Sequence, residues 1–208
     1  MDQLVIALTG ATMLAACCNA AEPWRTWPPR DYLVRSLVAG TEKILASYHP
    51  QTGRFGTEPW ICSDQNVLLP LAVAWELDDP NNPYFHDQNL LDVIARGGEV
   101  LVDEQDEQGQ WTFRKKDNST WGQILMPWTY SRWIRAYQIV GQALPAASRS
   151  KWEQGLRLGF RVLAARGFPH VHNIPTHHAM ALYIAGQCFE QEQWCQAARE
   201  FMPRVVAA

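Results

Sequence analysis

The sequence predicts an all-α fold in which helical hairpins stand side by side as an incomplete α/α toroid. Helical periodicity recurs along most of the chain, and no segment alternates apolar and polar residues convincingly. Amphipathic segments also alternate with segments that are apolar nearly all round, which predicts an outer and an inner layer of helices. Finally, Asp64, Thr120 and Thr176 are spaced by 56 residues (120 − 64 and 176 − 120) at equivalent starts of inner segments. A repeated unit of this length predicts an array of hairpins.

The expected helices follow one another from residue 31 onward, about half of a ring of six or seven hairpins. The amphipathic segments, expected as outer helices, are residues 31–48, 88–102, 148–165 and 190–206. The apolar segments, expected as inner helices, are residues 63–77, 119–140 and 176–185. Pro70 and Pro127 fall at matching depths in two inner segments, where each either marks a late helix start or kinks the helix. Residues 110–113 suit a short extended piece.

Length and composition limit the classes of function. The chain has 208 residues, of which 47% are hydrophobic and 19% charged, and this suffices for one domain with a substantial core. A net charge of −3 gives no electrostatic reason to expect nucleic acid or an anionic membrane surface as a partner. Ten tryptophans is a high count, and indole rings are surfaces on which sugar rings stack. We therefore expect a globular protein with an aromatic-rich cleft.

The N-terminal residues resemble an export signal. Residues 4–16 are apolar but too few to span a bilayer, and small and then polar residues follow. Leu14-Ala-Ala-Cys17 also resembles a bacterial lipobox, which implies a lipid anchor at Cys17. The first three residues carry no Lys or Arg, so a misassigned start or a buried N-terminal helix is the alternative. We expect residues 1–21 to be a signal peptide or lipoprotein signal. Residues 22–208 would then form the domain, part of a larger toroid, in an exported periplasmic or membrane-anchored protein.

The remaining cysteines form no CxxC pair and no zinc spacing. Cys188 and Cys195 share a predicted helix face, but seven helical residues place them about 10 Å apart, too far for a disulfide. Both are expected to be core thiols.

A histidine-rich loop runs into the last apolar segment. Four of the six histidines fall within residues 170–178, and we expect Pro175 at the first helical position and Gly186 as the stop. A helix apolar on every side would be buried on every side, which leaves only its N-terminal end in contact with water. The free N–H groups and the helix dipole at that end favour an anion. This end is the first candidate site.

In a toroid, the loops that precede the inner helices converge at one end of the ring. Their ring and amide groups suit an oligosaccharide, because rings stack on sugars, amides bridge hydroxyls and imidazoles move protons. The candidate residues are Trp60, Asp64, Gln65, Asn118, Trp121, His170, His172, Asn173, His177 and His178.

Several of these residues also have a structural interpretation. Asp64 and Thr120 could be helix N-caps, and Trp121 could belong with Trp128 to the core. Because adjacent helical residues diverge by about 100°, one of His177 and His178 must point away from the cleft. The histidine spacing does not suit metal ligands on one helix face, so we expect neither a metal nor another cofactor.

The loop of residues 48–56, the alternating helices and the segment from His172-Asn173 to His177-His178 resemble the heparinase II/III and alginate-lyase superfamily. The resemblance covers about residues 31–206. It implies an N-terminal α/α toroid followed by an antiparallel β-sandwich, and cleavage of acidic polysaccharides by β-elimination. Asn173 would neutralise the uronate carboxylate, and His177 or His178 would handle a proton. The sequence lacks the later toroid segment that usually supplies the catalytic tyrosine, and it lacks the sandwich.

Two hypotheses follow from these residues. The first is a polysaccharide lyase-like domain that acts on uronate-containing glycans. The second is a non-catalytic helical toroid lipoprotein that binds glycan or protein through the same aromatic cleft. A glycoside hydrolase with Asp64 as its acid is a weaker hypothesis, because hydrolysis normally needs two carboxylates and the predicted cleft offers one.

Overall fold

The computed structural model describes residues 28–207, so the expected signal at residues 1–21 and the anchor at Cys17 lie outside the described residues. From Val34 onward the described chain forms one compact unit. That unit is mostly helical, which confirms the predicted all-α class. None of the helices within residues 28–207 has the length and hydrophobicity needed to cross a membrane.

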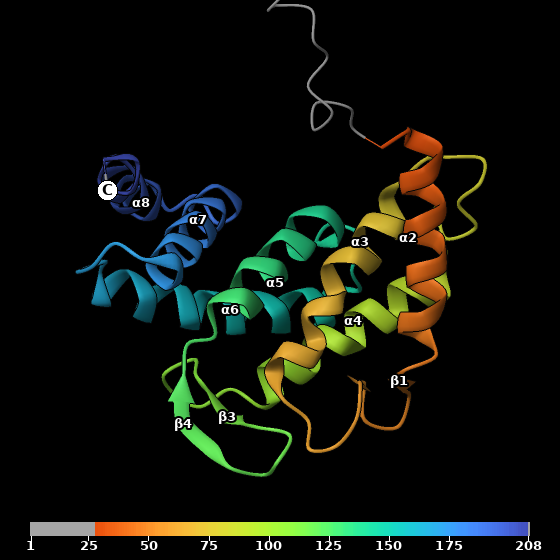
Figure 1. Cartoon of the computed structure of the whole chain (residues 1–208), viewed down its shortest axis with the longest axis horizontal. Helices are drawn as coiled ribbons and strands as arrows, with labels where there is room; N and C mark the ends of the chain where they lie inside the picture. Colours follow the sequence, from red (N-terminus) through yellow and green to blue (C-terminus); the bar gives the residue numbers. More distant parts are fainter. Residues whose placement is uncertain (1–27, 208) are drawn as a thin grey trace, which may run out of the picture. The chain divides into compact units, whose positions relative to one another are not determined.

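Helices and short strands follow one another along the chain (Figure 1). The helices are α2 (Arg30–Leu45), the 3₁₀ helix η2 (Cys62–Val67), α3 (Leu68–Glu76), α4 (Gln88–Asp103), α5 (Pro127–Val140), α6 (Ala146–Arg166), α7 (Asn173–Cys188) and α8 (Glu192–Val206). The strands are β1 (Tyr48–His49), β2 (Arg54–Phe55), β3 (Trp111–Arg114) and β4 (Thr120–Ile124). Strand β1 pairs with β2, and β3 pairs with β4, both in antiparallel orientation.

The helices pack as consecutive hairpins in two rows (Figure 1). In the first row α3 packs on α5, and α5 packs on α7. In the second row α4 packs on α6, and Phe160 of α6 meets Trp194 of α8 with ring centroids 6.1 Å apart. Trp111, Trp133 and Trp152 fill the core between the rows, each almost fully buried.

The predicted interval of 56 residues between helix starts is wrong. Thr120 begins strand β4, and α5 begins seven residues later at Pro127, so the segment 119–140 is a strand followed by a helix. Gly122 has a φ of 85°, which an α-helix excludes, and β4 instead satisfies its backbone by pairing with β3. The extended piece expected at residues 110–113 is confirmed as β3. Pro127 is the first residue of α5, so it marks a late helix start.

Helix α7 is longer and less buried than predicted. It begins at Asn173 and ends at Cys188, so Pro175 is its third residue and Gly186 lies inside it. Gly186 allows close approach of α8, because a Cβ there would lie 2.5 Å from the Cys195 sulfur. Met180 is 38% exposed. It lines an apolar groove of about 750 Å³ between α7 and α8, so the prediction that α7 is buried on every side is wrong.

The described cysteines are free thiols as predicted, but Cys188 ends α7 and Cys195 lies in α8, so the prediction that they share one helix face is wrong. Cys62, Cys188 and Cys195 are all free thiols. Cys62 and Cys195 are buried and Cys188 is half-buried. Burial raises the pKa of the Cys62 thiol to about 12, so it is an unreactive thiol of the core.

Candidate functional site

A cleft of about 260 Å³ separates the loop after β2 from strand β3. Two loops that sequence reasoning assigned to one end of the hairpin array form its opposite walls. Its lining residues are Arg54, Glu58, Pro59, Trp60, Glu104, Trp111, Thr112 and Arg114.

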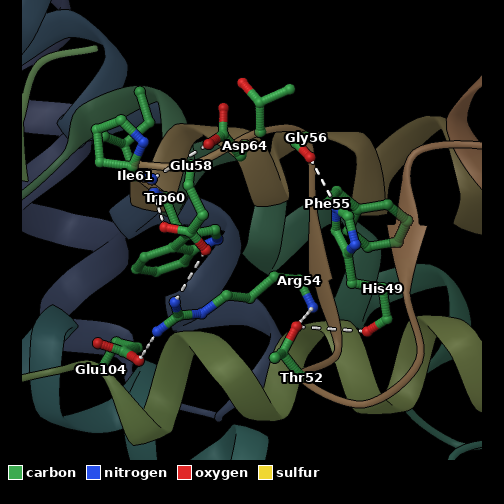
Figure 2. A network of polar contacts seen from close by, with 12 residues as sticks. His49, Thr52, Arg54, Phe55, Gly56, Glu58, Trp60, Ile61, Asp64 and Glu104 are labelled. Atoms are coloured by element: carbon green, nitrogen blue, oxygen red, sulfur yellow. Dashed lines mark hydrogen bonds and ion pairs between the residues drawn. The ribbon is translucent and has the colours of Figure 1, made fainter. Parts of the chain in front are cut away.

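Strand β2 positions the first cation of this cleft. Phe55 is buried and pairs with Tyr48 across the two-stranded sheet, so its neighbour Arg54 points to the opposite face and enters the cleft. Figure 2 shows the Arg54 side chain extending between Glu58 and Glu104. One guanidinium nitrogen bonds Glu104 at the end of α4, and the guanidinium carbon lies 5.0 Å from the Trp60 ring centroid. These two contacts hold the guanidinium group in place.

The two carboxylates beside Arg54 differ in how firmly they are held. Glu104 accepts a hydrogen bond from the Arg54 guanidinium group, and its side chain is 40% exposed. Glu58 lies 3.5 Å from the other guanidinium nitrogen, its side chain is 76% exposed, and its second oxygen accepts a hydrogen bond from the Trp60 backbone N–H at 3.0 Å. Glu58 is therefore a loose and exchangeable partner of Arg54.

Gln65, predicted to bind substrate, instead holds the loop together. Its side chain is buried, and its oxygen accepts hydrogen bonds from the Phe55 backbone N–H at 3.0 Å and the Trp60 indole N–H at 3.4 Å. Its nitrogen donates to the carbonyls of Gly53 at 3.2 Å and Gly97 at 2.6 Å. Because all these groups are engaged inside the protein, Gln65 orients Trp60 and does not face the cleft.

Asp64 and Lys116 connect the β3–β4 hairpin to the loop that follows β2. The Lys116 ammonium lies 2.9 Å from an Asp64 oxygen and donates to the carbonyls of Thr57 at 2.7 Å and Pro59 at 3.0 Å. The same Asp64 oxygen accepts a hydrogen bond from the Ile61 N–H at 3.1 Å, at the start of η2 (Figure 2). Asp64 is thus the third residue of η2 and bonds the backbone of the N-cap residue Ile61, so the expectation that Asp64 is itself an N-cap is wrong. Thr120 lies in a strand and caps no helix.

The hairpin of β3 and β4 presents an aromatic surface. Trp121 is 71% exposed, and its ring stacks on Phe113 with centroids 5.0 Å apart. The Lys115 ammonium lies 5.7 Å from the Trp121 ring centroid. Asn118 forms the turn, with a φ of 66°, and is exposed. The interpretation of Trp121 as a core residue on one helix face with Trp128 is wrong, because Trp121 lies in a strand. We call Phe113, Arg114, Lys115 and Trp121 the hairpin surface.

The third loop meets the base of this hairpin. His170, His172 and Asn173 are exposed, and His172 is the N-cap residue of α7. The Asn173 side-chain oxygen accepts a hydrogen bond from the Ile174 N–H at 2.9 Å. The nitrogen of the Asn173 amide donates to no other described residue, which leaves this donor available to a ligand.

His177 and His178 have different surroundings, as the geometry of a helix requires. His178 is buried and its Nε2 donates to the Leu125 carbonyl at 3.1 Å. Burial lowers the pKa of His178 to about 4, so the ring is neutral at pH 7. His177 is half-buried, its ring centroid lies 6.0 Å from that of Trp128, and its Nδ1 has no hydrogen-bond partner among the described residues.

The structure therefore brings two of the three predicted groups together. Lys116 joins the loop of Trp60 and Asp64 to the hairpin of Asn118 and Trp121. The His178 bond to Leu125 places the start of α7 at the base of β4, and a strand of four residues spans about 13 Å from there to Trp121. Of the residues in these positions, sequence reasoning missed Arg54, Glu58, Glu104, Phe113, Arg114, Lys115 and Lys116. A hairpin interpretation of residues 111–124 would have identified the Phe113–Trp121 pair.

Comparison of the chain with protein-family models, with curated proteins and with solved structures finds no match in any of the three. Within residues 28–207, no group of three or more His, Cys, Asp or Glu side chains is placed to hold a metal ion. The functional interpretation therefore depends on the geometry of the cleft, the hairpin surface and the start of α7.

Proposed function

We propose that this protein binds acidic oligosaccharides on the hairpin surface. The observation that carries the proposal is the exposure of Trp121, which is 71% exposed while its ring is held by Phe113 from β3. An aromatic ring that contributes little to the core, and that a second ring orients, is a platform for the apolar face of a sugar. Sugar rings stack on such a platform with little loss of side-chain entropy.

The charges around Trp121 favour an acidic glycan. Arg114 and Lys115 are neighbours on the hairpin, and the Arg114 side chain makes no hydrogen bond or ion pair with another described residue. Lys115 lies 4.0 Å from Asp117 at the turn, which is a weak contact between exposed groups. The hairpin surface thus carries a local positive charge on a chain whose net charge is −3, and this charge would attract uronate carboxylates.

We further propose that the two rows of helices are an arc of an α/α toroid. Consecutive hairpins with apolar helices in one row and amphipathic helices in the other are the building units of such a ring. The loops before α3 and α5 meet at one end of the rows through Lys116 with Asp64, and α7 contacts the end of the second of these loops through His178 with Leu125. An exported protein with residues 1–21 as its signal, with or without a lipid at Cys17, suits a glycan ligand outside the cytoplasm.

The first experiment is a calorimetric titration with an alginate or heparan-derived oligosaccharide and, as the neutral control, a cello-oligosaccharide. Trp121→Ala should weaken binding of the acidic ligand about tenfold, the loss expected for a central aromatic contact. Phe85→Ala is the matched control. Phe85 is also exposed, but it follows the C-terminal end of α3 and is not part of the hairpin surface. Equal affinity of Trp121→Ala and the parent would refute the proposal.

Lyase chemistry is a second candidate, favoured by the start of α7. Asn173 presents a free amide donor at a helix N-terminus, where a developing carbanion beside a carboxylate would be stabilised. His177 is the imidazole available for proton transfer, because His178 is bonded to Leu125. The test is the ultraviolet absorbance of an unsaturated uronate product from alginate, heparan or hyaluronan. If turnover occurs, Asn173→Ala should lower its rate about 10²–10³-fold, and Asn173→Asp should lower it further. No product from the parent protein would exclude the lyase.

A further inference from the structure

We propose that the cleft beside β3 is a carboxylate-binding subsite, formed by Arg54 and Arg114, in which Glu58 occupies the place of a ligand carboxylate. The inference rests on the proposed function for the ligand, a uronic acid, and it names a position that binds the acid group itself. Arg114 also belongs to the hairpin surface, but Arg54 and Glu58 lie outside it, so variants of Trp121 and Glu58 let the two proposals fail separately.

Arg54 is preorganised to receive an oxyanion. Glu104 and the Trp60 indole fix its guanidinium group, and Gln65 in turn fixes the Trp60 indole N–H. The side chain is only 27% exposed, so it has lost part of its hydration before a ligand arrives. A guanidinium group carries five N–H donors, and the one hydrogen bond to Glu104 leaves donors available.

Glu58 is the partner that a ligand can replace. Its oxygen lies 3.5 Å from the Arg54 nitrogen, beyond normal hydrogen-bond length, and its side chain is 76% exposed. An exposed ion pair of this kind contributes little to stability. Glu58 can therefore turn into solvent at small cost and leave its position beside Arg54 to another carboxylate.

Arg114 provides the second cation from the opposite wall. It lies on β3, lines the same cleft as Arg54 and is exposed, and its side chain has no hydrogen bond or ion pair with another described residue. The charges that line the cleft are two arginines and two glutamates. Once Glu58 has turned away, the remaining groups carry one net positive charge, which a single carboxylate would balance.

The size of the cleft favours one sugar unit. Its volume of about 260 Å³ lies just below the range of about 300–1,000 Å³ typical of small-molecule sites. A uronate carboxylate between the two guanidinium groups would place its ring near the Trp60 indole. The planar bidentate geometry of arginine suits a carboxylate, while a sulfate ester shares the negative charge and is tested separately.

The experiment titrates the ¹⁵N-labelled full chain with sodium glucuronate and follows the Trp60 indole N–H and the Arg54 side-chain N–H by NMR. Glu58→Gln should tighten glucuronate binding about two- to five-fold, because it removes the competing carboxylate and keeps an acceptor for the Trp60 backbone N–H. Arg114→Gln should weaken binding about tenfold, the loss of a charge-assisted hydrogen bond. Glu107→Gln and Arg135→Gln are matched controls, because both residues are exposed and outside the cleft, and they should bind as the parent does.

Each other outcome overturns the inference. Parent protein that does not bind glucuronate, Glu58→Gln that binds no better than Glu107→Gln, or Arg114→Gln that binds as the parent does would refute the subsite. Stronger binding of sodium sulfate than of sodium glucuronate would refute its assignment to a carboxylate.

Oligouronate binding separates this inference from the proposed function. If that binding depends on Trp121 but not on Glu58, only the subsite fails. If glucuronate shows the predicted pattern while oligosaccharide binding ignores Trp121, only the platform fails.

Discussion

The hairpin of β3 and β4 and the start of α7 are both rich in residues that can bind a sugar, but they use them differently. On the hairpin, Trp121 and Arg114 remain exposed, and the Arg114 side chain has no hydrogen-bond or ion-pair partner among the described residues. At the start of α7, His178 is buried against the Leu125 carbonyl and His177 lies beside Trp128. The histidine cluster thus contributes partly to packing, while the hairpin keeps its groups available.

This difference shows that a binding site requires side chains whose donors, acceptors and rings are free to contact a ligand, and not only suitable residue types. Gln65 and Trp60 illustrate it within one loop. The Gln65 amide makes four hydrogen bonds inside the protein, and this holds Trp60 at the edge of the cleft. Polar residues whose groups are satisfied internally determine where the free groups lie.

The largest expected effect is the loss of stability on replacement of Gln65, whose role we assign to holding the loop together. Gln65→Ala should lower the free energy of unfolding by about 4 kcal/mol, because it leaves buried donors and acceptors of Phe55, Gly53 and Gly97 without partners. Thermal or urea unfolding measures this change. Asn118→Ala is the control at an exposed predicted residue, and we expect it to change stability by less than about 1 kcal/mol. Similar losses for both variants would contradict the distinction between support and surface.

A somewhat smaller effect should appear as a dependence on pH. The pKa of His178 is about 4 in the folded protein and 6.5 in the unfolded chain. As the pH falls, the unfolded state therefore binds a proton at a higher pH than the folded state does. The contribution of this ring to stability is therefore present above pH 6.5 and is lost as the pH falls from 6.5 to 4. The loss should reach about 3 kcal/mol.

The variant His178→Gln isolates that contribution. It keeps a donor for Leu125 and removes the titrating ring, so its stability should fall less steeply than that of the parent between pH 6.5 and 4. His170→Gln, in the exposed loop before α7, serves as the control. Parallel curves for the parent and His178→Gln would show that His178 is not buried as a neutral ring.

The sequence predicted what local periodicity can predict. The apolar spacing predicted α4, α6 and α8 to within a few residues. The prediction of one helix over residues 119–140 was wrong because aromatic and apolar residues suit both a buried helix and a strand. Pairing with β3 selects the strand for residues 120–124.

The candidate site was harder to predict because its partners are distant in the chain. Arg54 meets Glu104 across 50 residues, and Lys116 meets Asp64 across 52. No local pattern brings these side chains together. The exposure of Trp121 likewise depends on the register of the hairpin, which places it opposite Phe113 and outside the core.

The most direct test of the central claim compares the two regions in one NMR titration of the ¹⁵N-labelled protein with an oligouronate. If the hairpin surface is the binding site, the Trp121 indole N–H and the backbone N–H groups of Arg114 and Lys115 should shift most. The Asn173 side-chain amide would then shift little. Shifts confined to Asn173 and His177, with the Trp121 indole unchanged, would contradict binding at the hairpin surface and would indicate a site at the start of α7.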